Sequence, residues 1–416
     1  MKSKMLLLQM VWGILCMSIF TACGSSESTI DKKQDVILAG DPTDIQLKKA
    51  VDCFNLNNSI YNVVIEEYEH ERLLVEISSG KGPDLIDNNW IDFEAAVRNE
   101  LLEDLSVYLA NSECLSKDML FENILEAFTI DDVLTCIPPS FAIDGVYGRT
   151  SEFRGFDSWG MEEFLAYINE NQGCSIMEGS NFGQSQQYIV MLSYWFEEDR
   201  WIDYANRKSN FNSPEFKALL EFALNYDARH DATILEETTE ERWKSEKILF
   251  LNNVLVNISD YYTLKELMGE DLYVVGYPSL SDEHALGAIG YHGFGINSNS
   301  KVKEGAWEFI EFQISNQEGN LKPDGGIPVR KSAYQEMLDE YREYRQKQAD
   351  KEVKLDDLEK EFEQLIQKIS FGRTGYSAIE TILVEELTTL FQEGKTVDEV
   401  ADVIHNRAQL YLDEQY

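Results

Sequence analysis

Residues 76–90, with the sequence EISSGKGPDLIDNNW, combine the end of a helix, a glycine turn and a buried strand within fifteen residues. Gly80 and Gly82 interrupt a helical pattern, and Pro83 opens a short apolar run that ends near Asp87. Two amides, an indole and a carboxylate follow that run. Polar side chains just beyond the carboxyl end of a parallel strand lie where open α/β sheets bind ligands. The segment therefore predicts a parallel sheet with a ligand-binding edge.

The residues before this segment alternate between strand and helix patterns. Residues 35–39 and 61–68 are rich in apolar and β-branched side chains and predict two strands. Between them, Asp41 and Pro42 are typical of the cap and first turn of a helix. Helical crossovers of this length require parallel pairing and a sheet that is covered on both faces. We therefore expect an α/β fold.

Length and charge limit the classes of function. A chain of 416 residues is too long for one ordinary core, so at least two domains are expected. The formal net charge of −39 comes from 75 acidic and 36 basic residues. Such an excess of negative charge makes nucleic acid a poor partner and disfavours a highly anionic ligand.

The first 22 residues predict a signal peptide. Two lysines precede an uncharged apolar run from Met5 to Ala22, and the run ends in Phe20-Thr21-Ala22-Cys23-Gly24. This ending resembles a bacterial lipobox, in which the cysteine carries lipid and becomes the new amino terminus. The resemblance implies lipidation of Cys23, with residues 23–34 as a flexible tether and a membrane anchor through the lipid. A transmembrane helix is the alternative interpretation.

Neither metal binding nor catalysis is indicated by a motif. Cys53, Cys114, Cys136 and Cys174 have spacings that fit no metal site, and the sequence leaves open whether they form disulfides or stay free. No two histidines stand four residues apart, and no Gly-x-Ser-x-Gly elbow occurs. A glycosidase pair of carboxylates would not be visible from spacing alone. We expect no catalytic residue, no metal and no cofactor.

Several further segments occur in an order that is typical of one family. They are LLEDL at 101–105, WGMEEFL at 159–165, GAIGYHGFGIN at 287–297 and GGIPVRK at 325–331. Together with residues 76–90 they resemble the extracellular solute-binding proteins of bacterial sugar-type ABC importers. The resemblance covers essentially the whole mature chain.

The resemblance implies a two-lobed periplasmic-binding-protein-like fold of type II, with discontinuous lobes joined by hinge strands and with C-terminal helices. Lobe 1 is expected at 35–138 plus 279–330, and lobe 2 at 139–278 plus 331–416 with the C-terminal helices. The first crossing is expected at 137–141, where two prolines interrupt an apolar run, and the second at 274–278.

The expected function is capture of a mono- or oligosaccharide in a cleft between the lobes, followed by delivery to the permease subunits of an ABC importer. The protein is then no enzyme, acts as a monomer and sits on the extracytoplasmic face of the cell membrane. A cell-surface glycan hydrolase or a glycan-adhesion module is the alternative.

A sugar site needs flat aromatic rings beside groups that donate and accept hydrogen bonds. The resemblance places several segments at the cleft, and our choice of residues within them is an inference. The candidate ligand-binding residues are Trp90, Asp92, Phe141, Tyr261, Tyr291 and His292. For Phe141 and Tyr291 core packing is the alternative, and for His292 a structural hydrogen bond.

Overall fold

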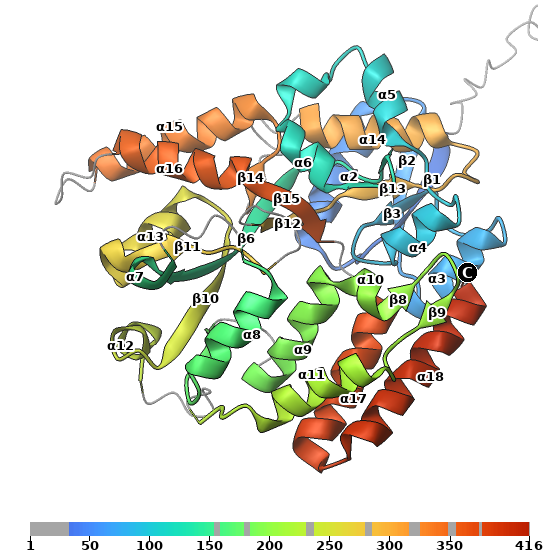
Figure 1. Cartoon of the computed structure of the whole chain (residues 1–416). Helices are drawn as coiled ribbons and strands as arrows, with labels where there is room; N and C mark the ends of the chain where they lie inside the picture. Colours follow the sequence, from blue (N-terminus) through green and yellow to red (C-terminus); the bar gives the residue numbers. More distant parts are fainter. Residues whose placement is uncertain are drawn as a thin grey trace, which may run out of the picture.

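The structure is a computed structural model and is shown in Figure 1. It describes residues 33–153, 159–178, 184–229, 237–278, 285–315, 325–347, 355–373 and 377–415. The expected signal peptide, Cys23 and nearly all of the expected tether lie outside the described residues.

The smaller of the two main sheets has four strands in the order β13-β3-β1-β2. These strands are β1 (Gln34–Ala39), β2 (Tyr61–Glu66), β3 (Leu85–Asp87) and β13 (Phe294–Ile296). β1 pairs in parallel with both β2 and β3, and β13 runs antiparallel to β3. The helices α2 (Ile45–Asn57) and α3 (His70–Ser78) make the crossovers. The predicted alternation of strand and helix is therefore confirmed in this part of the chain.

The start of α2 differs from the expectation. Its cap is Asp44, whose side chain accepts hydrogen bonds from the backbone N–H groups of Gln46 and Leu47. Asp41 instead accepts from the backbone and hydroxyl of Thr43. The helix begins later than predicted because the side chain of Asp41 closes a turn of its own.

The larger sheet has seven strands, with the order β15-β12-β6-β10-β7 and with β11 and β14 also beside β6. Its strands are β6 (Ser140–Arg149), β7 (Ser175–Glu178), β10 (Ile248–Leu255), β11 (Leu272–Val274), β12 (Leu286–Tyr291), β14 (Ile327–Pro328) and β15 (Ile369–Arg373). β10 and β12 run antiparallel to β6, while β7 is parallel to β10 and β15 to β12. Every residue of β6 is buried, as expected for a central strand.

The chain passes from one sheet to the other at three places in this arrangement, the last of them between β13 and β14. It enters the larger sheet at Ser140, directly after the two prolines. β12 pairs with β6 up to Tyr291, and β13 pairs with β3 from Phe294 onwards. The chain therefore leaves the larger sheet for the smaller one at residues 292–293. The expected second crossing between lobes at 274–278 stays a prediction. Residues 286–291 and β14, which we expected in lobe 1, pair within the larger sheet.

Helices cover both faces of the larger sheet (Figure 1). One hydrophobic core joins α13, α15 and α16 to one face of β6 and extends to the smaller sheet, and a second core joins α8, α9, α11, α17 and α18 to the other face. Their bounds are α8 (Met161–Glu170), α9 (Ser185–Phe196), α11 (Pro214–Asn225), α13 (Ile258–Met268), α15 (Lys331–Lys347), α16 (Leu355–Gln367), α17 (Ala378–Glu393) and α18 (Val397–Gln415). The α/β class and the C-terminal helices agree with the sequence analysis.

The remaining elements are short, apart from α14 (Lys303–Ser315), which packs against α2. They are α4 (Phe93–Arg98), α5 (Leu105–Asn111), α6 (Glu122–Ala127), α7 (Thr150–Phe153), α10 (Glu198–Trp201), α12 (Thr239–Lys244), the 3₁₀ turns η1 (Lys117–Met119) and η2 (Gly269–Asp271), and the hairpins β4 (Thr129–Ile130) with β5 (Val133–Leu134) and β8 (Ile202–Asp203) with β9 (Lys208–Ser209). Cys53, Cys114, Cys136 and Cys174 are free thiols. Among the described helices, none combines the length and the apolar character that a membrane crossing requires.

Candidate ligand-binding site

Three connections meet at the carboxyl end of the smaller sheet. Asp41 follows β1. Asp87 is the last residue of β3, and Asn88 comes directly after it. His292 lies in the link from β12 to β13. The backbone N–H of Asn88 donates to the carbonyl oxygen of Gly293 at 2.8 Å, which ties two of these connections together. The sequence analysis expected a ligand site at this edge because parallel strands end here.

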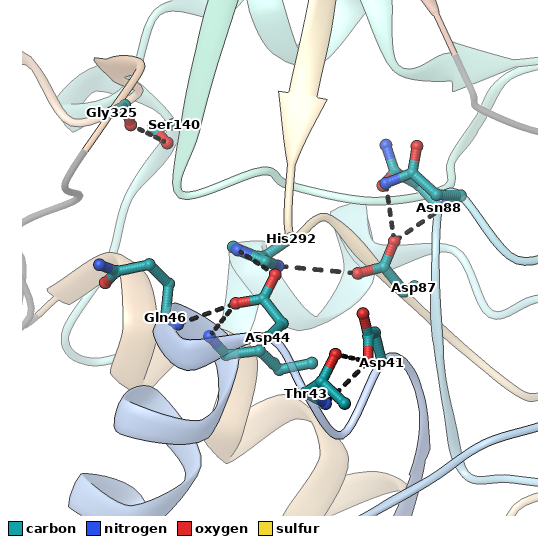
Figure 2. Close-up of polar contacts among 11 residues, drawn as sticks. Asp41, Thr43, Asp44, Gln46, Asp87, Asn88, Ser140, His292 and Gly325 are labelled. Atoms are coloured by element: carbon teal, nitrogen blue, oxygen red, sulfur yellow. Dashed lines mark hydrogen bonds and ion pairs between the residues drawn. The ribbon is translucent and has the colours of Figure 1, made fainter.

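His292 stands between two carboxylates (Figure 2). Its Nε2 is 3.7 Å from Oδ2 of Asp44, and its Nδ1 is 3.8 Å from Oδ2 of Asp87. Burial on its own would lower the pKa of His292, but the two carboxylates outweigh burial and raise the pKa above its ordinary value. The residue has a φ of 52°, a strained conformation for a side chain of this size. The imidazole is therefore held in one place by charge and by the backbone around it.

A cavity of about 210 Å³ lies beside His292, between the smaller sheet and the start of β6. Amide, hydroxyl, ammonium and aromatic groups contribute to its wall. The lining residues are Gln46, Lys49, Ala50, Pro139, Ser140, Val256, Tyr291, His292, Gln313, Gly325 and Gly326. They come from α2, β6, β12, α14 and the segments that follow β10 and precede β14. The cavity thus brings together residues up to 280 positions apart, from Gln46 to Gly326.

One wall of the cavity depends on a close backbone approach. The hydroxyl of Ser140 donates to the carbonyl oxygen of Gly325 at 3.2 Å (Figure 2). Gly326 has a φ of 85°, and a Cβ there would come within 3.0 Å of Ser140 and of the ring of Tyr291. Glycine at 326 therefore lets this segment lie directly against Tyr291.

The structure brings two of the six candidate residues, Tyr291 and His292, into the wall of this cavity. Trp90 lies at the same sheet edge, but its ring stacks on His70 at 4.6 Å between centroids and an interplanar angle of 12°. The Nδ1 atom of His70 is also 3.0 Å from the carbonyl oxygen of Trp90. Trp90 is half-buried and outside the cavity wall.

The other three candidates lie elsewhere. Phe141 is fully buried and packs edge-on against Phe121, because its side of β6 faces the first core. Tyr261 donates to Glu361 and lines a separate cavity of about 1120 Å³ between α13 and α16. Asp92 caps α4 and accepts from the backbone N–H of Ala95 at 2.9 Å. The structure therefore does not bring these three residues together with Tyr291 in the wall of one cavity.

The sequence analysis missed several residues of the wall, including Gln46, Ser140 and Gln313. A signal was present for Gln46, since it opens the helix that follows a parallel strand, and for Ser140, since it follows the crossing prolines. Gln313 stands near the end of α14 in an amphipathic helix, where no local pattern distinguishes it. Within the described ranges, no cluster of three or more His, Cys, Asp or Glu side chains has a geometry suited to a metal ion.

We expect the titration of His292 to report on its two carboxylate neighbours. The raised pKa means that the ion pairs stabilise the fold fully at pH values below the ordinary histidine pKa of about 6.5. This stabilisation is lost as the pH rises through the raised value. Following the imidazole by NMR, Asp87→Asn and Asp44→Asn should each lower the pKa of His292, whereas Asp41→Asn should change it much less. An unchanged pKa in both of the first two variants would contradict the described geometry.

Comparison with known proteins identifies the family. Residues 49–353 match the family model described as bacterial extracellular solute-binding protein. Because this match covers well over half of the 416 residues, the chain belongs to that family. No curated protein sequence matches the chain significantly. The family is one of binding proteins, which favours solute capture over the glycan hydrolase that the sequence left open.

Solved structures share the fold. The sugar-binding protein MalE from Xanthomonas citri is 17% identical with a TM-score of 0.54, and the match covers 92% of this chain and 98% of that one. A periplasmic oligogalacturonide binding protein from Yersinia enterocolitica is 16% identical with a TM-score of 0.53, and the match covers 92% of this chain and 99% of that one. An ABC substrate-binding protein from Listeria monocytogenes, in complex with cycloalternan, is 16% identical with a TM-score of 0.50, and the match covers 92% of this chain and 100% of that one. The expected two-lobed periplasmic-binding-protein-like fold is confirmed.

Proposed function

We propose that this protein captures a carbohydrate, a mono- or oligosaccharide, in the space between its two main sheets and delivers it to the permease subunits of an ABC importer. The observation that carries the proposal is the mixed wall of the cavity beside His292. Amide and hydroxyl groups at Gln46, Ser140 and Gln313 can exchange hydrogen bonds with sugar hydroxyls, and Tyr291 offers an aromatic ring for the C–H face of a sugar.

The volume of the cavity beside His292 favours the binding of one sugar unit there. Its volume of about 210 Å³ is below the range of roughly 300–1,000 Å³ that is usual for ligand pockets. A longer oligosaccharide would extend from the cavity along the edge that carries Asp87 and Trp90. Three proteins that share the fold are described as a sugar-binding protein, an oligogalacturonide binding protein and a complex with cycloalternan, which supports a carbohydrate ligand.

Capture works through a shift between open and closed forms. We place the divisions between lobes at Ser140, at residues 292–293 and between β13 and β14, where the chain passes between sheets. A ligand that contacts both sides of these divisions binds the closed form more tightly, and its differential affinity sets how far the equilibrium moves. Neither nucleic acid nor a cofactor takes part, and the protein acts as a monomer.

The experiment that tests carbohydrate capture is a thermal-shift screen of the mature protein against a library of neutral sugars. A ligand at a hundred times its dissociation constant adds about 2.7 kcal/mol to the free energy of unfolding. Incubation of each hit with the protein, followed by chromatography of the sugar, tests for hydrolysis at the same time. Stabilisation without cleavage supports the proposal; stabilisation only by peptides or dicarboxylates, or cleavage of the sugar, would contradict it.

Location at the membrane follows from the first residues of the chain. We propose that residues 1–22 are removed as a signal peptide and that Cys23 carries lipid, which holds the protein on the extracytoplasmic face of the cell membrane. The small residues Ala22 and Gly24 around Cys23 support this. Cys23→Ala should abolish labelling with radioactive palmitate, with Cys114→Ala as the control that stays labelled. Continued labelling of the Cys23→Ala protein would contradict lipidation at this residue.

A further inference from the structure

Apart from the cavity beside His292, a further contact joins the part of the chain around the smaller sheet to the helices of the second core. The hydroxyl of Tyr411 in α18 donates to Oδ2 of Asp92, the cap of α4, at 3.4 Å. The guanidinium carbon of Arg98 in α4 lies 3.6 Å above the ring centre of Tyr204, which follows β8. Since α4 precedes the passage at Ser140, and α10 and α18 pack in the second core on the larger sheet, these contacts cross between the proposed lobes.

Carboxylates from both sides are linked through Arg98 and Tyr204 in this contact. Glu94 lies on α4 and pairs with Arg98 at 3.0 Å between Oε2 and Nη2. Glu198 lies on α10 and accepts hydrogen bonds from the hydroxyls of Tyr194 at 3.0 Å and of Tyr204. The hydroxyl of Tyr194 is in turn 3.1 Å from that of Ser377, just before α17. Four elements of the second core, α9, α10, α17 and α18, therefore contribute to the surroundings of the acids.

Burial raises the pKa values of these acids, and neighbouring negative charges raise those of Glu94 and Glu198 further. Burial, and then the negative charges of Glu198 and Asp92, raise the pKa of Glu94 to about 7 in spite of Arg98. The pKa of Glu198 is raised by burial and by Asp92, against the lowering effect of the two tyrosine hydroxyls and Arg98. The pKa of Asp92 is also raised by burial. Solvent moderates the repulsion, since 40% of the Glu94 side chain is exposed.

We propose that the contact between α4 and α10 is a proton-dependent latch between the lobes: a proton on the Glu94–Glu198 pair holds the two helices together, and its loss releases them. The proposal goes beyond capture of a sugar, because it concerns lobe closure in the absence of any ligand. It also gives Asp92 a role in the contact between lobes.

The direction of the pH effect follows from comparing the pKa of Glu94 in the contact with its pKa when the two helices are apart. A glutamate in water titrates near its ordinary pKa of about 4.3, whereas Glu94 in the contact keeps its proton up to about 7. Between these values the contact binds a proton that the separated state has released, so the latch weakens as the pH rises through this window. Arg98 stays charged. Tyr194 keeps its proton, because burial raises its pKa well above the ordinary value.

Small-angle X-ray scattering of the ligand-free protein tests the latch at constant ionic strength. We expect the radius of gyration of the wild type to be larger at pH 8 than at pH 5.5. Glu198→Gln removes the charge that faces Glu94 and keeps a hydrogen-bonding group, so this variant should stay compact at both pH values. Glu94→Gln should also stay compact at both pH values. It replaces Glu198→Gln as the test if circular dichroism shows that Glu198→Gln folds poorly.

The matched control is Glu113→Gln, which removes one negative charge from an exposed residue away from the contact. It should keep the pH-dependent shift of the wild type, and this separates the latch from general charge repulsion across an acidic protein. A wild-type radius that is the same at both pH values would overturn the proposal. The proposal would also be overturned if the radius of gyration of both glutamine variants changed with pH as much as that of the control. Because no sugar is present, either failure leaves the proposed carbohydrate capture untouched.

Discussion

Tyr291→Ala is expected to weaken carbohydrate binding by about 2 kcal/mol, which is roughly thirtyfold in the dissociation constant. The ring of Tyr291 is half-buried in the cavity wall, and the backbone of Gly326 lies close against it. A ring fixed in this way pays little conformational entropy when a sugar packs against it. Calorimetry with a sugar from the thermal-shift screen measures the effect.

Two variants separate the contributions of this side chain. Tyr291→Phe keeps the ring and removes the hydroxyl, so it should retain most of the affinity if packing dominates. Tyr344→Ala removes a ring that is 54% exposed on α15 and should leave binding unchanged. If Tyr291→Ala binds the sugar as tightly as Tyr344→Ala does, the cavity beside His292 is not the binding site.

Phe250→Ala should lower the free energy of unfolding by about 3–5 kcal/mol. Phe250 in β10 is fully buried, and its ring contacts four others at centroid distances of 5.2–6.1 Å, namely those of Phe153, Trp159, Phe164 and Tyr167. Removing it leaves a cavity at the centre of this aromatic cluster, which joins the larger sheet to α7 and α8. Urea unfolding followed by circular dichroism gives the change.

The control for this stability effect is Leu56→Ala on α2. Leu56 is 84% exposed, so the change in unfolding free energy should stay within about 0.5 kcal/mol. A loss of less than about 1 kcal/mol in Phe250→Ala would mean that the aromatic rings around β10 do not pack as described.

Local patterns were sufficient for much of the fold. The parallel strands β1, β2 and β3 and their crossover helices follow from short apolar runs, glycine turns and capping residues, all of which lie within a few positions of one another. The edge formed by Asp87, Asn88 and Trp90 could be located for the same reason, since the end of a parallel strand is a local feature. Tyr291 and His292 were chosen as candidates because they stand in a glycine-rich segment that resembles the family.

Long-range pairing could not be predicted from these patterns. Asp144 in β6 is buried, accepts from Tyr277 at 2.8 Å and pairs with Arg373 at 3.0 Å, and nothing near Asp144 in the sequence indicates either partner. Phe141 and Tyr261 were chosen as aromatic residues at segment ends, but the direction of a side chain depends on sheet register and helix packing. The place of β12 in the larger sheet is likewise set by its ladder with β6.

The most direct test of carbohydrate capture is a crystal structure of the protein with a sugar from the screen. We expect the sugar to lie between the two sheets, packed on the ring of Tyr291 and within hydrogen-bonding distance of at least two of Gln46, Ser140 and His292. A sugar bound in the separate cavity beside Tyr261, with the cavity beside His292 left empty, would contradict this account.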